Sequence, residues 1–100
     1  MDKQITAVPA PWQGMVLSCA KCSRKLDGGF GKKGRQALPK MLKEALRASG
    51  RRQAFRVVET PCLGLCPRKA VAVIRGDRPA EMLVVPEGLP ATEVLERLLR

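Results

Sequence analysis

Residues 55–67 read FRVVETPCLGLCP, an apolar segment followed by Cys62 and Cys66 and then at once by Pro67. Residues 55–59 predict a β-strand that runs straight into a cysteine loop. A similar arrangement stands upstream, where residues 15–18 form a short apolar segment that leads into Cys19 and Cys22. The chain has 4 cysteines in all, so a four-thiolate metal or iron–sulfur site would use every one of them.

Further elements are predicted from periodicity. Apolar residues repeat at three and four positions over residues 38–49, with Pro39 suited to a first helical turn and Gly50 to a stop. Residues 71–74 and 82–85 predict two strands, and the turn at 76–79 favours a hairpin between them. A last helix is predicted from about Pro90 to Arg100. The order β-α-β-β-β-α predicts an α/β fold with a mixed four-stranded sheet.

Two segments lack such a period. Residues 1–13 predict an irregular N-terminal arm that tucks Trp12 onto the body, and residues 14–100 predict one domain. Residues 23–35, rich in glycine and cations, predict a loop between Cys22 and the first helix. Residues 29–34 match G-x-G-x-x-G, but they lack the βαβ context of a dinucleotide site, so we interpret them as a flexible loop.

The predicted topology places the cysteines together. If the first two strands are parallel across the intervening helix, as a right-handed βαβ unit requires, their carboxyl ends lie side by side. Cys19 and Cys22 leave one end, and Cys62 and Cys66 leave the other. Loops at the carboxyl edge of an α/β sheet are a usual ligand site. We therefore expect one site that contains all four cysteines.

The donor set restricts the chemistry of that site. Thiolates suit iron–sulfur clusters and zinc, whereas calcium and magnesium prefer oxygen. The chain has 0 histidines, which excludes Rieske centres, Cys/His zinc fingers and imidazole-dependent catalysis. Apolar segments are too short to span a membrane, and residues 1–4 do not begin a signal peptide. We expect a reducing cytoplasm, where cysteines serve as metal ligands more often than as disulfides.

The charge predicts an acidic partner. A formal net charge of +10 favours attraction to polyanions. Nucleic acid is the generic candidate, but with only 1 tryptophan, 2 phenylalanines and 0 tyrosines stacking on single strands has little support. The cations could also stabilise a negatively charged cluster, or simply keep a small domain soluble. Five of them flank the cysteines and could steer an acidic redox partner: Lys21, Arg24, Lys25, Arg68 and Lys69.

The strand followed by Cys62-Leu63-Gly64-Leu65-Cys66 resembles the second ligand pair of the thioredoxin-like [2Fe–2S] ferredoxins, which include the small cluster-bearing subunit of bacterial NADH dehydrogenase. The element order is similar over residues 14–100. The resemblance implies an electron-transfer protein without substrate turnover of its own. It implies that Cys62 and Cys66 hold one iron of a [2Fe–2S] cluster and that Cys19 and Cys22 hold the other. It also implies that Gly64 lets the backbone approach the sulfides, and it allows a homodimer.

Two alternatives stay open. Only two residues separate Cys19 from Cys22, which is a shorter gap than the family usually has. Zinc ribbons share this spacing. The second hypothesis is therefore a structural Zn(Cys)₄ module with a basic face that binds nucleic acid or an acidic protein. Thiol–disulfide exchange at Cys19 and Cys22 is the third. We disfavour it because the predicted loop would separate the pair from a helix N-terminus and because Cys62 and Cys66 would have no role.

Overall fold

The computed structural model describes residues 3–100. Its elements are β1 (Met15–Cys19), α1 (Ala20–Lys25), the short 3₁₀ helix η1 (Lys32–Gly34), α2 (Leu38–Ala48), β2 (Arg56–Thr60), β3 (Ala70–Arg75), β4 (Met82–Pro86) and α3 (Ala91–Leu99). All four predicted strands and both predicted helices are present within one or two residues of their expected limits. The described part of the chain also contains α1 and η1, which were not predicted.

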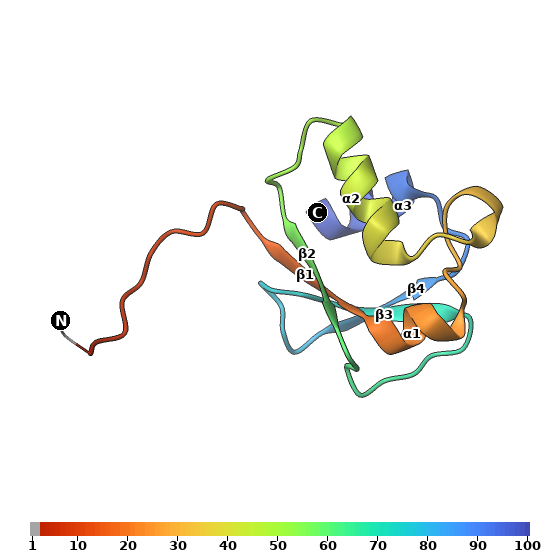
Figure 1. Ribbon diagram of the computed structural model, residues 1–100, viewed down its shortest axis with the longest axis horizontal. Helices are drawn as coiled ribbons and strands as arrows, with labels where there is room; N and C mark the ends of the chain where they lie inside the picture. Colours follow the sequence, from red (N-terminus) through yellow and green to blue (C-terminus); the bar gives the residue numbers. More distant parts are fainter. Residues whose placement is uncertain (1–2) are drawn as a thin grey trace.

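The sheet is mixed, as expected, with the strand order β2-β1-β3-β4 (Figure 1). β1 runs parallel to β2, and β3 runs antiparallel to both β1 and β4. The parallel pair confirms the βαβ arrangement, because α2 carries the chain back across the sheet between β1 and β2. The predicted hairpin between β3 and β4 is confirmed as well. β2 and β4 are the edge strands.

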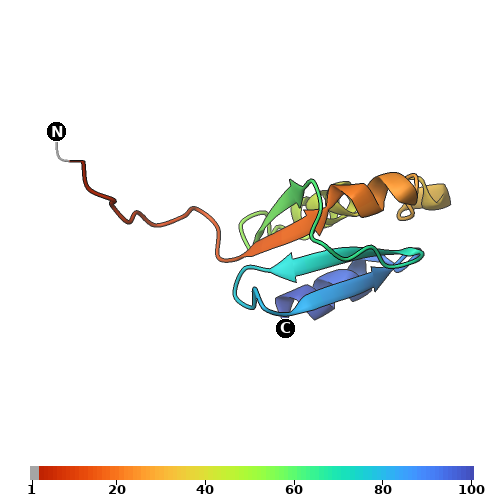
Figure 2. The same ribbon diagram turned by 90° about the horizontal axis from the view of Figure 1, so that it is seen from below.

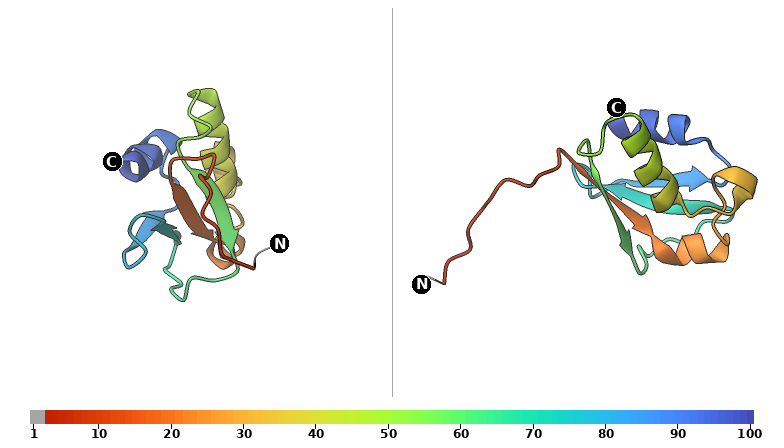
Figure 3. Two further views of the ribbon diagram at one scale, coloured as in Figure 1. Left: turned by 90° about the vertical axis from the view of Figure 1, so that its left-hand side faces the viewer. Right: turned by 45° about the horizontal axis from the view of Figure 1, so that its top comes forward.

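The core lies between one face of the sheet and the layer formed by α2 and α3. These two helices lie next to each other on that face in Figure 1 and in both views of Figure 3. Helix α2 contributes an amphipathic stripe, because residues three and four positions apart share a face. Its buried members are Leu38, Met41, Leu42 and Leu46. Val57, Val71, Val73 and Val85 of the strands are buried with them.

The glycine-rich segment forms the predicted loop, which contains the short helix η1 and is anchored to the core. Phe30 is fully buried in the core, and its backbone exchanges hydrogen bonds with that of Gln36 at 3.0 and 2.7 Å. A Cβ on Gly28, whose φ is +100°, would lie 2.4 Å from the backbone of Arg35. The glycines therefore let the chain fold tightly around one anchoring aromatic side chain.

The N-terminal arm extends away from the body, as Figure 2 shows. Residues 3–10 have no regular secondary structure and are exposed, whereas the first two residues of the predicted arm lie outside the described residues. The expected contact of Trp12 with the body is present. The Arg56 guanidinium carbon lies 5.6 Å from the centre of its ring, within range of a cation–π interaction.

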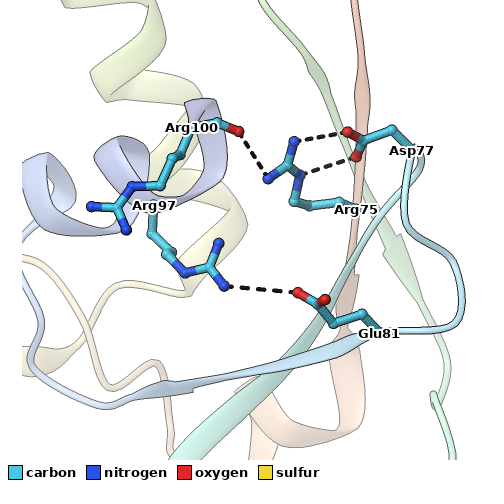
Figure 4. Close-up of polar contacts among 5 residues, drawn as sticks. All are labelled: Arg75, Asp77, Glu81, Arg97 and Arg100. Atoms are coloured by element: carbon cyan, nitrogen blue, oxygen red, sulfur yellow. Dashed lines mark hydrogen bonds and ion pairs between the residues drawn. The ribbon is translucent and has the colours of Figure 1, made fainter.

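Polar contacts tie the end of the chain to the hairpin (Figure 4). Arg75 donates two hydrogen bonds to the Asp77 carboxylate at 2.8 and 3.0 Å, and one at 3.2 Å to the carbonyl of Arg100. Arg97 and Glu81 form a longer, exposed ion pair of 3.7 Å, which adds little stability. Over residues 3–100, none of the helices has the length and hydrophobicity required to cross a bilayer.

Candidate metal centre

The two parallel strands deliver the cysteine pairs to one edge of the sheet. Cys19 is the last residue of β1 and lies opposite Thr60, the last residue of β2. Cys22 follows Cys19 after two residues, and Cys62 follows Thr60 after one. The predicted placement of both cysteine pairs at the carboxyl ends of neighbouring strands is thus what the structure shows.

The first cysteine pair lies at the start of helix α1. We expected a loop after Cys22, but α1 begins at Ala20, with Cys19 as its N-cap residue and Cys22 within its first turn. This helix of 6 residues is too short to show a hydrophobic period. Its packing against β3 and the burial of Cys22 and Ser23 hold it in place. Contrary to our prediction, no loop separates the first pair from a helix.

The two pairs differ in exposure. Cys19 is 0% and Cys22 2% exposed, so both thiols belong to the hydrophobic core. Cys62 and Cys66 are exposed on the loop between β2 and β3. One half of the site is therefore shielded by the protein, and the other half faces solvent.

Contacts connect the loop of the second pair to the first pair. The Cys22 Sγ lies 3.8 Å from the carbonyl oxygen of Leu65, to which the thiol donates. The Gly64 N–H donates to the Cys62 Sγ at 3.3 Å. Within residues 3–100, however, no three cysteine, histidine or acidic side chains are close enough together to hold a metal ion. The described structure brings the loops into contact without closing the four sulfurs around one point.

The local environment separates the acidities of the two buried thiols. Burial acts to raise the pKa of Cys19, but hydrogen bonds from the backbone of Cys22, Leu63 and Lys21 and from the Cys22 side chain outweigh it and lower that pKa. Burial raises the pKa of Cys22, and the neighbouring sulfurs of Cys19 and Cys66 raise it further. A hydrogen bond from the Ala72 backbone acts in the opposite direction but does not cancel this rise. The pKa of Cys19 is therefore the lower of the two.

Three buried hydroxyl groups belong to residues next to these cysteines in the chain or in the sheet, and they were missed in the sequence. The side-chain oxygens of Ser18, Ser23 and Thr60 are buried and have no hydrogen-bond partner within the described residues. Ser18 precedes Cys19, Ser23 follows Cys22, and Thr60 lies opposite Cys19. Their positions near cysteines in the sequence were the signal that could have identified them. Buried polar groups are normally satisfied. Thr60 lies on the same face of the sheet as Cys19, whereas Ser18 lies on the opposite face because successive strand residues alternate. The orphaned hydroxyls of Thr60 and Ser23 therefore mark a place suited to a hydrogen-bond acceptor.

The backbone conformation at position 64 favours glycine. Its φ is +88°, and a Cβ built on it would have no atom within 4 Å. The left-handed conformation therefore accounts for this residue in the structure, and close approach of its backbone to cluster sulfides stays a prediction. The five cations that flank the cysteines are exposed, at Lys21, Arg24, Lys25, Arg68 and Lys69.

Comparison of the chain with protein-family models, with curated proteins and with solved structures found no match.

Proposed function

We propose that this protein binds a [2Fe–2S] cluster through Cys19, Cys22, Cys62 and Cys66 and transfers single electrons, with no substrate turnover of its own. The proposal assigns it a thioredoxin-like fold and a place in the reducing cytoplasm. The observation that carries it is the convergence of every cysteine of the chain at the carboxyl ends of two adjacent parallel strands.

The residues present fit such a cluster in kind, and both cysteine pairs lie at one edge of the sheet, but their four sulfurs are not gathered around one point within residues 3–100. Four thiols are the donor set that a [2Fe–2S] cluster requires. Leu63 and Leu65, which lie between the second pair, already contact Cys19 and Cys22 through their backbones. The orphaned hydroxyls of Ser23 and Thr60 offer donors to sulfur. On this proposal, binding draws the exposed loop at 62–66 towards the buried pair.

The chain's own residues would set the properties of the centre. A [2Fe–2S] cluster supplies one-electron transfer when it is bound. The buried pair, Cys19 and Cys22, keeps water from one side, and the exposed pair leaves the other side open to a partner. The flanking cations offset negative charge on the thiolates, which favours reduction. We infer that they also attract an acidic redox partner protein.

The decisive experiment is the visible absorption spectrum of protein purified without oxygen, recorded before and after dithionite, with iron, sulfide and zinc measured on the same sample. We expect a red-brown protein with two irons and two sulfides per chain that partly bleaches on reduction. A colourless protein that resists reconstitution with iron and sulfide would contradict the proposal. If it carried one zinc instead, it would support the structural zinc module.

Thiol–disulfide exchange is the second candidate, because α1 begins immediately after Cys19. A cysteine at a helix N-terminus after a strand is the arrangement that redox-active dithiols use. This function needs Cys19 and Cys22 and assigns no role to the second pair. Reduction of an insulin disulfide by a variant with both Cys62→Ser and Cys66→Ser would support it, whereas no turnover by that variant or by the native chain would exclude it.

A further inference from the structure

Two adjoining hollows lie far from the cysteines, between the base of the N-terminal arm, α2 and the edge strand β2. The first has a volume of about 550 Å³, and the second of about 180 Å³. Arg52 and Arg56 line both hollows, Trp12 lines the first, and Lys43 and Arg47 line the second. We call Lys43, Arg47, Arg52 and Arg56 the basic track. No acidic residue contributes to the lining of either hollow.

The charges of the basic track are not neutralised by neighbours. Within residues 3–100, the ion pairs are Arg75 with Asp77 and Arg97 with Glu81, both in the region that Figure 4 shows. The four side chains of the track are exposed and take part in neither pair. Four like charges along adjoining concave surfaces concentrate a positive potential there. The site therefore selects for an anion.

Trp12 makes the site more than a cluster of cations. Its half-buried side chain lines the larger hollow, beside the guanidinium of Arg56. An acidic peptide needs cations but gains little from an indole, whereas a nucleotide offers phosphate to the arginines and a flat base to the ring. A hollow of about 550 Å³ is also within the usual size range for a small-molecule site. These features favour a nucleotide unit.

The basic track is extended, which favours a strand over a single phosphate. Lys43 and Arg47 lie one helical turn apart on α2, a rise of about 6 Å. Arg52 follows the end of α2 in the chain and Arg56 begins β2, and both line the first hollow as well as the second. Successive cations can therefore contact successive phosphates. Arg56 begins β2 and Thr60 ends it, so about 13 Å of strand separates the track from the cysteine edge.

We propose that the basic track and Trp12 bind single-stranded nucleic acid, with phosphates on Lys43, Arg47 and Arg52 and a base stacked against Trp12. The site lies at the amino end of the parallel strand pair, so the proposal does not depend on the metal centre at the other end. The small aromatic content of the chain argues against stacking in general, but the fold places its 1 tryptophan among the cations.

Intrinsic fluorescence tests this directly, because Trp12 is the sole tryptophan. We expect a thymidine 12-mer to quench the fluorescence of the full chain. Anisotropy of the labelled 12-mer should show affinity that falls with salt. The double variant Arg47→Gln, Arg52→Gln should reduce the slope of log K against log salt by about 1.4, since each single-strand phosphate contact contributes about 0.7.

The matched control removes two charges elsewhere. Lys32→Gln with Arg78→Gln changes two exposed cations outside both hollows, and we expect its slope to equal that of the native chain. Equal losses in the two double variants would overturn the proposal, because binding would then follow net charge alone. Circular dichroism of both variants establishes that they fold.

Trp12→Leu tests stacking separately from charge. We expect it to weaken binding of the 12-mer roughly tenfold at unchanged salt slope, with Trp12→Phe restoring part of the loss. Unchanged affinity in Trp12→Leu would overturn the stacking assignment. Binding of poly-glutamate or of a 12-base-pair duplex as tight as that of the single strand would overturn the choice of ligand.

Discussion

Cys19 lies opposite Thr60 in the parallel register of β1 and β2, and each is the last residue of its strand. Because the two strands end side by side, the chain segments that follow them start from the same edge of the sheet. This pairing brings two cysteine pairs together even though 39 residues separate Cys22 from Cys62. It also places the unsatisfied hydroxyl of Thr60 next to the buried pair.

Both cysteine pairs should be required for metal binding. We expect Cys22→Ser and Cys62→Ser to lose most of the bound iron equally, because each removes one of four thiolates. Iron and sulfide content and the visible spectrum after reconstitution give the measurement. Full iron content in Cys62→Ser would show that the exposed pair is not a ligand pair.

Thr60→Val should change the redox properties without weakening the fold. If the Thr60 hydroxyl donates to sulfur in the loaded protein, its removal should lower the reduction potential by on the order of tens of millivolts, the equivalent of one hydrogen bond. The metal-free variant should be at least as stable as the native chain, because a buried unsatisfied hydroxyl is removed. Redox titration and urea unfolding measure the two effects.

The control for this change is Thr92→Val, since Thr92 is exposed on α3. Its reduction potential should equal that of the native protein. If Thr60→Val leaves the potential unchanged and destabilises the metal-free chain, the hydroxyl has a structural partner and not the role in the metal centre that we assign to it.

The glycine-rich loop should respond very differently to alanine at two of its positions. Gly28→Ala combines a φ of +100° with a Cβ only 2.4 Å from the Arg35 backbone, so we expect it to lower the free energy of unfolding by about 3 kcal/mol or more. At Gly34, φ is +63° and a Cβ would have no atom within 4 Å. Gly34→Ala should therefore lower the free energy of unfolding by only about 1 kcal/mol. Similar losses in the two variants, measured by urea unfolding, would contradict the close approach of Gly28 to the Arg35 backbone.

Electron transfer should depend on the cations beside the cysteines. Lys25→Glu with Lys69→Glu should slow reaction with an acidic redox partner at low salt by about tenfold, because charge reversal removes the electrostatic attraction. Stopped-flow rates measured against ionic strength test this. The control, Arg52→Glu with Arg56→Glu, makes the same charge change at the opposite end of β1 and β2 and should have a smaller effect. An unchanged salt dependence in the first variant would exclude steering by these cations.

Much of the fold could be predicted from local patterns. The stripe of Leu38, Met41, Leu42 and Leu46 repeats at helical spacing because one face of α2 is buried. The strands are short apolar segments, and the Gly-Asp-Arg-Pro turn marks the hairpin between β3 and β4. Right-handed crossover then fixes β1 and β2 as parallel neighbours. These inferences succeed because burial of each element leaves a signal in its own residues.

The sequence by itself determined that β1 and β2 are parallel neighbours, that the available donors are thiols, and that the net charge is positive. Only the tertiary structure decided that Cys19 and Cys22 are buried while Cys62 and Cys66 are exposed, since packing against β3 controls that difference. It also decided that α1 forms, because a helix of 6 residues is stable only when packed. Finally, it gathered Trp12, Arg47 and Arg56 from three segments, because their proximity depends on how α2 and β2 pack and not on spacing along the chain.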